Sequence, residues 1–155
     1  MRRCSKVCSS GHSCSVIEIR PNTAADANDL LEVWRHAIDA SHQFLSPNDR
    51  SDIDPLVAAY VGSADLTVAL IDGTPVAFMG VTGSNIDSLF IHPRGQGMGI
   101  GRRLVDHVAR PTTVDVNEQN QAGVAFYRRL GFEVTGRSER DAEGRPYPLL
   151  HLRRV

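Results

Sequence analysis

The alternation of apolar and polar residues predicts four strands in the first part of the chain. A first strand spans Val16 to Arg20, where apolar and polar side chains alternate. Three further β-rich runs follow a helical stretch and cover residues 66–71, 76–82 and 85–91. Asp72-Gly73 separates the first two of these runs and is a strong signal for a hairpin turn. The pattern therefore indicates one strand and a later meander of three.

The helical spacing of apolar residues predicts four helices. Thr23 offers an N-cap with Asp26 at the third helical position, and the helix behind it extends to about Ala40. Trp34 lies on the apolar face of this helix, so we expect it in the core rather than against a ligand. Three further stretches carry the same kind of apolar stripe and cover residues 49–61, 102–109 and 119–130.

The order of these elements predicts a mixed α/β domain. Strands are also expected over residues 112–116, 132–140 and 147–153, so strands and helices alternate near the middle of the chain. Such a unit commonly places ligands at the carboxyl ends of parallel strands. The chain has 155 residues and no internal repeat, and we expect a single domain over residues 16–155.

The first fifteen residues are small, polar and aperiodic. We expect residues 1–15 to form a disordered tail. They hold all the cysteines, Cys4, Cys8 and Cys14, together with His12. These side chains could ligate zinc, but their spacing lacks the paired cysteines of structural zinc sites, so we expect no metal. The absence of cysteine from the remaining chain argues against a disulfide framework and favours the reducing cytoplasm.

The composition argues against two classes of partner. The formal net charge is −1, with 17 basic and 18 acidic residues, and it supplies no broad basic field for nucleic acid or an anionic membrane. No apolar run approaches the roughly 20 residues that a membrane-spanning helix needs. We therefore expect no nucleic-acid and no membrane partner, while the oligomeric state, monomer or homodimer, stays open.

The segment Arg94–Arg103 carries the strongest chemical signal. Four glycines alternate there between a strand end and a helix start. Their backbone N–H groups can converge on one point at the positive end of a helix, which favours an anion. A P-loop needs a lysine that this segment lacks, and no register fits the dinucleotide fingerprint G-x-G-x-x-G. What remains is a Q-x-x-G-x-G pattern starting at Gln96, and the alternative is a flexible connection without a ligand.

With this pattern the chain resembles the GCN5-related N-acetyltransferase (GNAT) superfamily, whose acyl-CoA loop reads [QR]-x-x-G-x-[GA]. Leu89-Phe90-Ile91-His92-Pro93 is similar to the fourth strand of that family and its proline exit. Residues 116–120 and 125–132 are similar to its N-x(5-7)-F-Y-x-x-x-G-F segment. These ordered blocks cover residues 86–132, and the flanking elements extend the match to about 16–153. Blocks at 40–45, 116–120 and 145–150 resemble a bacterial subgroup of the family.

The resemblance implies a fold and a cosubstrate. The GNAT fold is an α/β (α+β) fold, with a mixed central sheet of six to seven strands and about four helices on both faces. The cosubstrate is acetyl-CoA, and no metal is implied. In the implied site the backbone of one strand pairs with the pantetheine arm, and the glycine segment holds the pyrophosphate. The implied cofactor-binding residues are Leu89, Phe90, Ile91, Gln96, Gly97, Met98, Gly99, Ile100, Gly101, Arg102 and Asn120.

By the same resemblance, Tyr127 is the catalytic residue. It follows Asn120 by seven residues, the separation at which the family often places its proton donor. A phenol with an ordinary pKa of about 10 is mostly protonated at neutral pH, so it can donate to a departing thiolate without special tuning. The alternative is a packing role, which we expect the neighbouring Phe126 to fill.

The acceptor side is less determined by the residues. His42 lies in the loop between the first two helices, a region that the family uses for acceptor binding, and Asp87 enters the fourth strand of the family layout. We take both as candidate substrate residues. Asp115 and Glu118 are further candidates for the base that receives the amine proton, and none of the three carboxylates is assigned as catalytic.

The sequence thus predicts an acetyl-CoA-dependent N-acetyltransferase. It would move the acetyl group to a primary amine of a small molecule or peptide by direct attack on the thioester. Two other classes stay open: a catalytically inactive acyl-CoA sensor or interaction module, and a nucleotide-phosphate binder. Turnover with a panel of amines separates the enzyme from the sensor, and a thermal shift with ATP rather than acetyl-CoA would identify the nucleotide binder.

Overall fold

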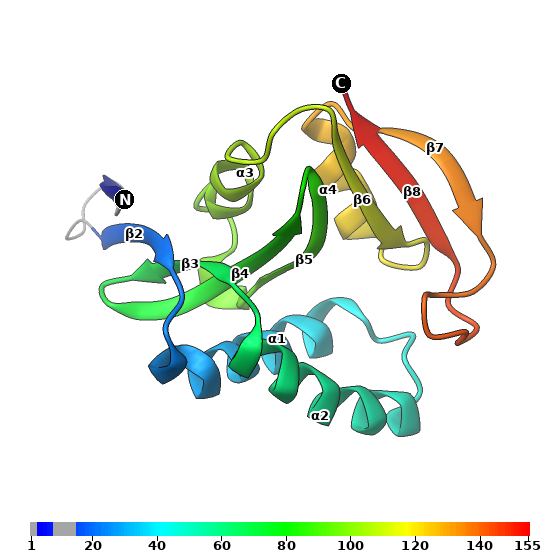
Figure 1. The fold of residues 1–155 in the computed structure, drawn as a ribbon, viewed down its shortest axis with the longest axis horizontal. Coiled ribbons are helices and arrows are strands. Elements are labelled where there is room, and N and C mark those ends of the chain that lie inside the picture. Colours follow the sequence, from blue (N-terminus) through cyan, green and yellow to red (C-terminus); the bar gives the residue numbers. More distant parts are fainter. Residues whose placement is uncertain (1–2, 8–14) are drawn as a thin grey trace. The chain divides into compact units, whose positions relative to one another are not determined.

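The computed structural model describes residues 3–7 and 15–155 (Figure 1). Within these residues, strands pair in the order β1-β2-β3-β4-β5-β6-β8-β7. Strands β5 and β6 pair in parallel, whereas the pairs β1–β2, β2–β3, β3–β4, β6–β8 and β7–β8 are antiparallel. The strands are Arg3–Val7 (β1), Ser15–Pro21 (β2), Leu66–Ile71 (β3), Thr74–Thr82 (β4), Asn85–Ile91 (β5), Thr112–Asn117 (β6), Glu133–Ser138 (β7) and Leu149–Arg154 (β8).

The helices begin where the sequence supplies caps. The N–H of Thr23 donates to Oδ2 of Asp26 at 2.8 Å, as the capping pattern predicted. Oγ of Ser46 accepts the N–H of Asp49 at 3.1 Å, so the second helix begins at Pro47, before the expected Asp49. The α-helices are Ala27–Ser41 (α1), Pro47–Ser63 (α2), Ile100–Val105 (α3) and Gln121–Arg129 (α4), and Ala24–Asp26 (η1) and Pro93–Gly95 (η2) are short 3-10 helices.

The chain divides into two compact units. Unit 1 comprises the described parts of Met1–Gly80 together with Ser88–Leu104, and unit 2 comprises Val81–Asp87 and Val105–Val155. Strands β4 and β5 contribute residues to both units. The glycine segment therefore belongs to unit 1, whereas Tyr127 belongs to unit 2.

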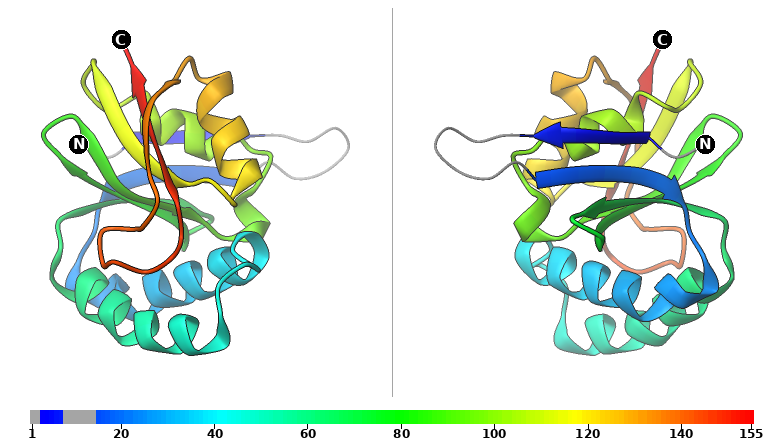
Figure 2. Two further views of the ribbon diagram at one scale, coloured as in Figure 1. Left: turned by 90° about the vertical axis from the view of Figure 1, so that its right-hand side faces the viewer. Right: turned by 90° about the vertical axis from the view of Figure 1, so that its left-hand side faces the viewer.

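Unit 1 has its core between a helix pair and a sheet. Helices α1 and α2 run side by side along one face of β2–β4, and α3 lies on the opposite side of these strands (Figures 1 and 2). Trp34 is 2% exposed within this core, as its helical position predicted. The Arg50 guanidinium covers the indole ring at 4.8 Å. The buried core side chains are Leu30, Val33, Trp34, Ile38, Val61, Leu66, Val68, Leu70 and Phe78.

The predicted hairpin between β3 and β4 is confirmed. Asp72 and Gly73 both adopt positive φ, at 49° and 83°, which matches the two central positions of a type I′ turn. Oδ1 of Asp72 also accepts the N–H of Val16 at 2.8 Å. This turn therefore anchors the start of β2 as well as joining β3 to β4.

Unit 2 is a small sheet with one apolar and one polar face. Val114 and Val116 of β6 are buried, and α4 packs beside this strand (Figure 1). Thr113 and Asp115 alternate with these valines and are more exposed. Because side chains of a strand point to opposite faces in turn, Thr113 and Asp115 share the polar face.

The structure corrects the expected tail. Arg3–Val7 forms β1, which pairs with β2 so that Arg3 lies opposite Ile19 and Val7 opposite Ser15. The expectation of disorder is therefore wrong for these residues, because main-chain hydrogen bonds along an open strand edge require no hydrophobic pattern. Cys8, His12 and Cys14 of the possible metal set lie outside the described residues. With β1 the sheet has eight strands rather than six or seven, and the predicted fold class is confirmed.

Helix α3 is shorter than its apolar stripe predicted. It ends at Val105 instead of Ala109. The N–H of Val108 donates to the carbonyl oxygen of Val105 at 3.0 Å in a tight turn, and Oγ1 of Thr112 donates to the carbonyl oxygen of Ala109 at 3.0 Å. Val108 stays buried, so burial along this segment continues after the helical conformation has ended.

Candidate functional site

The glycine segment of unit 1 adopts a backbone that side chains disfavour. It begins within η2 and ends within α3, which starts at Ile100. Gly97 and Gly99 both have φ of +75°, a conformation that costs glycine little. A Cβ atom built on either residue would have no described atom within 4 Å, so the space beside both glycines is open. Glycine is therefore needed here for the turn of the backbone and not for close packing.

Main-chain hydrogen bonds hold the start of this segment to β4 and β5. The N–H of His92 donates to the carbonyl oxygen of Val76 at 2.7 Å. Gly95 is buried, and a Cβ atom there would lie 3.3 Å from the side chains of both Ile91 and Val76. Nε2 of Gln96 approaches the carbonyl oxygen of Ile91 at 3.5 Å. Gly95 thus lets the loop lie close against the strands.

The side chains of the segment differ in exposure. Ile100 is 1% exposed, so only its backbone can meet a ligand, whereas Met98 is half-buried and Arg102 is exposed. A guanidinium nitrogen of Arg103 donates to Oγ of Ser5 on β1 at 2.5 Å. Of the two neighbouring arginines, Arg102 is thus the one with its side chain in solvent.

Leu89, Phe90 and Ile91 form the last part of β5 and are half-buried. The pairing of β5 with β6 covers Asn85 opposite Thr113 and Ile86 opposite Val114, and residues 89–91 lie beyond it. This is the stretch whose backbone was predicted to pair with a pantetheine arm.

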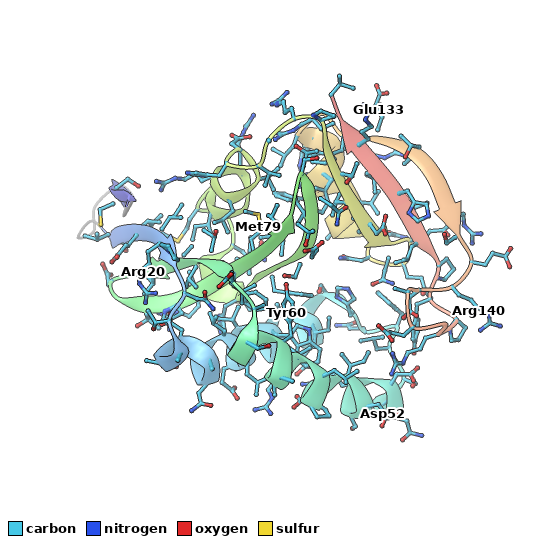
Figure 3. All side chains as sticks on the ribbon, viewed as in Figure 1. Arg20, Asp52, Tyr60, Met79, Glu133 and Arg140 are labelled. Carbon is cyan, nitrogen blue, oxygen red and sulfur yellow. The ribbon has the colours of Figure 1, made fainter. Side chains whose placement is uncertain are left out.

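A hydroxyl cluster fixes the middle of β5 within unit 1. Oγ of Ser88 accepts the N–H of Gly80 at 3.0 Å and lies 2.8 Å from the hydroxyl oxygen of Tyr60, which Figure 3 labels. A Cβ atom on Gly80 would collide with the Tyr60 hydroxyl. Because Gly80 has no side chain, the two hydroxyl groups can occupy the space beside its Cα atom.

His92 precedes the segment and has a structural role. Its Nδ1 accepts the N–H of Arg94 at 3.1 Å, which caps η2. Its ring lies 4.5 Å from the ring of His36. Burial lowers the pKa of His92, and the nearby His36 and Arg94 lower it further. The neutral ring that results is the form that accepts this hydrogen bond.

In unit 2, Asn120 begins the helix that carries Tyr127. Oδ1 of Asn120 accepts the N–H of Gly123 at 3.1 Å, so this side chain caps α4. Tyr127 is 7% exposed, and its ring packs edge-on against Phe126 at 4.9 Å and Phe132 at 5.2 Å. The expectation that Phe126 supplies the packing is wrong, because Tyr127 is the buried residue of α4 and Phe126 is only half-buried.

Burial raises the pKa of Tyr127 above its ordinary value. The phenol therefore stays protonated at every physiological pH, which suits a proton donor. The same burial makes the phenolate less stable, so the phenol gives up its proton only to a strong base. A thiolate that is itself in an apolar environment is such a base.

The candidate acceptor residues lie in different units. In unit 1, Nδ1 of His42 lies 2.6 Å from Oγ of Ser41. In unit 2, Asp87 is exposed and accepts from Oγ1 of Thr82 at 2.5 Å and from Nδ2 of Asn85 at 2.8 Å.

The other two carboxylates also have partners within unit 2. Glu118 accepts from Nε of Arg137 at 2.7 Å, and Oδ1 of Asp115 lies 2.6 Å from Nδ1 of His151. The contact between Asp115 and His151 was not predicted, because the two residues lie 36 positions apart in the chain.

Comparison with known proteins identifies the family to which this chain belongs. A profile for the acetyltransferase (GNAT) domain matches residues 62–134. The chain is 45% identical over 141 residues to the peptidyl-lysine N-acetyltransferase YjaB of Salmonella typhimurium strain LT2, which covers 88% of this chain and 97% of that relative. The chain belongs to the GNAT family of acetyltransferases.

Solved structures agree with this membership. The solution structure of apo-form YjaB from Escherichia coli matches with a TM-score of 0.85 and 43% identity, over 90% of this chain and 97% of that one. The structure of yncA from Salmonella typhimurium with acetyl-CoA has the same fold, with a TM-score of 0.61 and 20% identity over 88% and 92% of the two chains. The GNAT fold predicted from the sequence is confirmed, and the bacterial subgroup is that of YjaB.

This GNAT protein is therefore an enzyme that transfers an acetyl group from acetyl-CoA to an amine, as its sequence predicted. In residues 3–7 and 15–155, no three histidine, cysteine, aspartate or glutamate side chains come together in a way that could hold a metal ion. The helices of this described part are all too short or too polar to cross a bilayer.

Proposed function

We propose that this acetyltransferase modifies the ε-amine of lysine in a peptide or protein. The observation that carries the proposal is its likeness, over 88% of the chain, to an enzyme named for peptidyl-lysine acetylation. The transfer to an amine follows from the family, and the lysine acceptor is the part proposed here. We also propose that the reaction takes place in the cytoplasm, which the lack of cysteine after Cys14 supports.

In this proposal, unit 1 holds acetyl-CoA mainly by its backbone. The N–H groups of residues 97–102 bind the pyrophosphate, and the exposed Arg102 adds positive charge. The open space beside Gly97 and Gly99 supports this assignment, because phosphate oxygens need close access to the peptide nitrogens. Gln96, Met98, Ile100 and Gly101 complete the loop.

The pantetheine arm pairs with the backbone of Leu89, Phe90 and Ile91 in the manner of an added strand. The location of these residues beyond the pairing with β6 supports this role. A backbone N–H in this stretch would hydrogen-bond the thioester oxygen and stabilise the negative charge that develops on it during attack.

The chemistry needs one attack and two proton transfers. The neutral lysine nitrogen attacks the thioester carbon, the new C–N bond forms, and the C–S bond breaks. The thiolate then takes the proton of the Tyr127 hydroxyl, which burial keeps in place until the sulfur atom becomes basic. We propose Asn120 as a CoA contact and His42 and Asp87 as acceptor contacts. The amine proton passes to solvent, and the Tyr127 phenolate regains a proton from solvent before the next turnover.

The proposal is tested with an N-terminally blocked peptide that carries one lysine, and with the same peptide carrying arginine instead. CoA release and an acetyl group located on the lysine by mass spectrometry are expected for the first peptide only. Turnover restricted to small amines would overturn the lysine acceptor. Binding of acetyl-CoA without turnover on any amine would instead favour the inactive sensor.

A further inference from the structure

The polar face of unit 2 contains three side chains in one hydrogen-bonded row. Oδ1 of Asp115 lies 2.6 Å from Nδ1 of His151, and Nε2 of the same imidazole lies 2.7 Å from Oγ of Ser138. Both ring nitrogens of His151 are thus in hydrogen-bond contact, one with a carboxylate and one with an alcohol. None of these residues has a role in the proposed acetyl transfer.

The partners determine the direction of the hydrogen bonds. An ionised carboxylate can only accept a hydrogen bond, so Nδ1 of the ring carries a hydrogen and donates it to the hydrogen bond with Asp115. In the neutral form of the ring, Nε2 then has a free lone pair, and the Ser138 hydroxyl is the donor. A serine hydroxyl that donates to a histidine, which a carboxylate orients, is the arrangement that activates serine nucleophiles on unrelated folds.

The strand register builds this row from three neighbouring strands. Asp115 on β6 lies directly opposite His151 on β8, and Gly136 on β7 lies opposite His151 from the other side. Because Gly136 has no side chain, the imidazole ring can lie over β7 and reach Ser138; a Cβ atom on Gly136 would approach Cδ2 of His151 to 3.3 Å. Glu133, the first residue of β7, and Arg140, two residues after its end, are labelled in Figure 3.

The row is accessible from solvent within unit 2. The side chain of His151 is 35% exposed and that of Asp115 is 55% exposed, and Ser138 is half-buried. A small acyl compound can therefore approach the Ser138 hydroxyl. The exposure of Asp115 weakens its electrostatic effect on the imidazole, so we expect a slow reaction rather than an efficient one.

We propose that Ser138 is the nucleophile of a second, hydrolytic site that acts on small activated acyl esters. Its Oγ attacks the acyl carbon and forms a C–O bond, while its proton passes to Nε2 of His151 and Asp115 stabilises the imidazolium. The bond to the leaving alcohol then breaks, and that alcohol takes the proton from Nε2. Water, deprotonated by the same nitrogen, cleaves the acyl-serine and restores the hydroxyl.

The test uses the full chain and 4-nitrophenyl acetate, with no CoA compound present. Release of 4-nitrophenol is expected to fall about tenfold or more in Ser138→Ala and in Asp115→Asn. The second variant keeps the size of the side chain but lets the imidazole adopt the other tautomer. Ser63→Ala is the matched control, because the Ser63 hydroxyl on α2 donates to the carbonyl oxygen of Ala59 instead of a histidine.

A fluorophosphonate probe provides a second measurement that does not depend on rate. Mass spectrometry is expected to locate the adduct on Ser138 in the wild-type chain and in Ser63→Ala, and to find no adduct at residue 138 in Ser138→Ala. Circular dichroism verifies that each variant is folded. An adduct on another residue, or equal hydrolysis by wild type and Ser138→Ala, would overturn the proposal.

Discussion

The glycine segment of unit 1 and the Asp115–His151–Ser138 row of unit 2 are built from different parts of the chain. The first consists of consecutive peptide groups, and its two positive-φ glycines present open backbone. The second consists of side chains from three strands, held within 2.6 and 2.7 Å by strand register. A main-chain site depends on backbone conformation, whereas a side-chain site depends on the identity of a few distant residues.

This contrast separates two kinds of sensitivity. A site made of peptide nitrogens should tolerate changes of side chain but not the addition of a Cβ atom at a left-handed position. A site made of side chains should fail when one functional group is removed, even if its shape is kept. The following experiments test this separation, beginning with the largest effect.

Removal of the Tyr127 hydroxyl group should have the largest effect on the acetyl transfer. In Tyr127→Phe, the ring and its packing against Phe132 remain, but the proton donor is lost. We expect kcat to fall about 100-fold, with little change in KM for acetyl-CoA. Steady-state kinetics with a lysine peptide measures both values.

The pH profile gives the companion measurement for Tyr127. Because burial raises the pKa of this phenol, the wild-type kcat should not decline through its ionisation below about pH 10. An unchanged kcat in Tyr127→Phe would show that the tyrosine has only a packing role, and the proposal that Tyr127 is the proton donor would be overturned.

The substitution Gly80→Ala should have the next largest effect, which is a loss of stability. Its Cβ atom would collide with the Tyr60 hydroxyl, so Gly80→Ala should lower the free energy of unfolding by about 2 kcal/mol. The double variant with Tyr60→Phe removes the colliding oxygen and should recover part of this loss. Denaturant unfolding of the four proteins measures the coupling, and purely additive losses would contradict the collision.

A methyl group at Gly99 tests the main-chain site directly. Gly99 has φ of +75°, where a Cβ atom costs about 1–2 kcal/mol, so Gly99→Ala should raise KM for acetyl-CoA about tenfold. Gly144→Ala is the matched control, because Gly144 has φ of +78° in a turn of unit 2 outside the glycine segment and should change stability but not KM. Equal KM values for the two variants would remove the glycine segment from cofactor binding.

The smallest effect concerns the ion pairs between α1 and α2. Arg35 first, and then Arg50, lowers the pKa of Asp54 to about 2. Because the folded pKa is depressed, this contribution to stability is present above the ordinary carboxylate range and is lost as pH falls towards about 2. Asp54→Asn should therefore destabilise the chain by at most about 1 kcal/mol near neutral pH and by less in acid, as measured by unfolding at several pH values.

How much of the fold could be predicted from the sequence differs from element to element. The meander, the Asp72-Gly73 turn and the first helix follow local rules, and all are confirmed. Helix α3 ended early because burial of Val108 does not require helical geometry. Strand β1 was missed because its pairing depends on the open edge of β2 and not on its own pattern.

The same difference applies to the candidate sites. The glycine segment is contiguous, so its residues could be recognised together, and the family assignment they indicated is confirmed. The roles assigned to Tyr127, Asn120 and His42 stay predictions. The contact of His151 with both Asp115 and Ser138 could not be seen in the sequence, because it depends on the register of three strands.

Strand β1 has a practical consequence for handling the protein. It occupies the outer edge of β2 through main-chain pairing from Arg3 to Val7. A truncated chain that starts at Ser15 would expose a row of unbonded amides, and such edges invite aggregation between molecules. Purification tags therefore belong after Val155, which is 83% exposed, and the residues ahead of β2 should be kept in any form made for crystallisation.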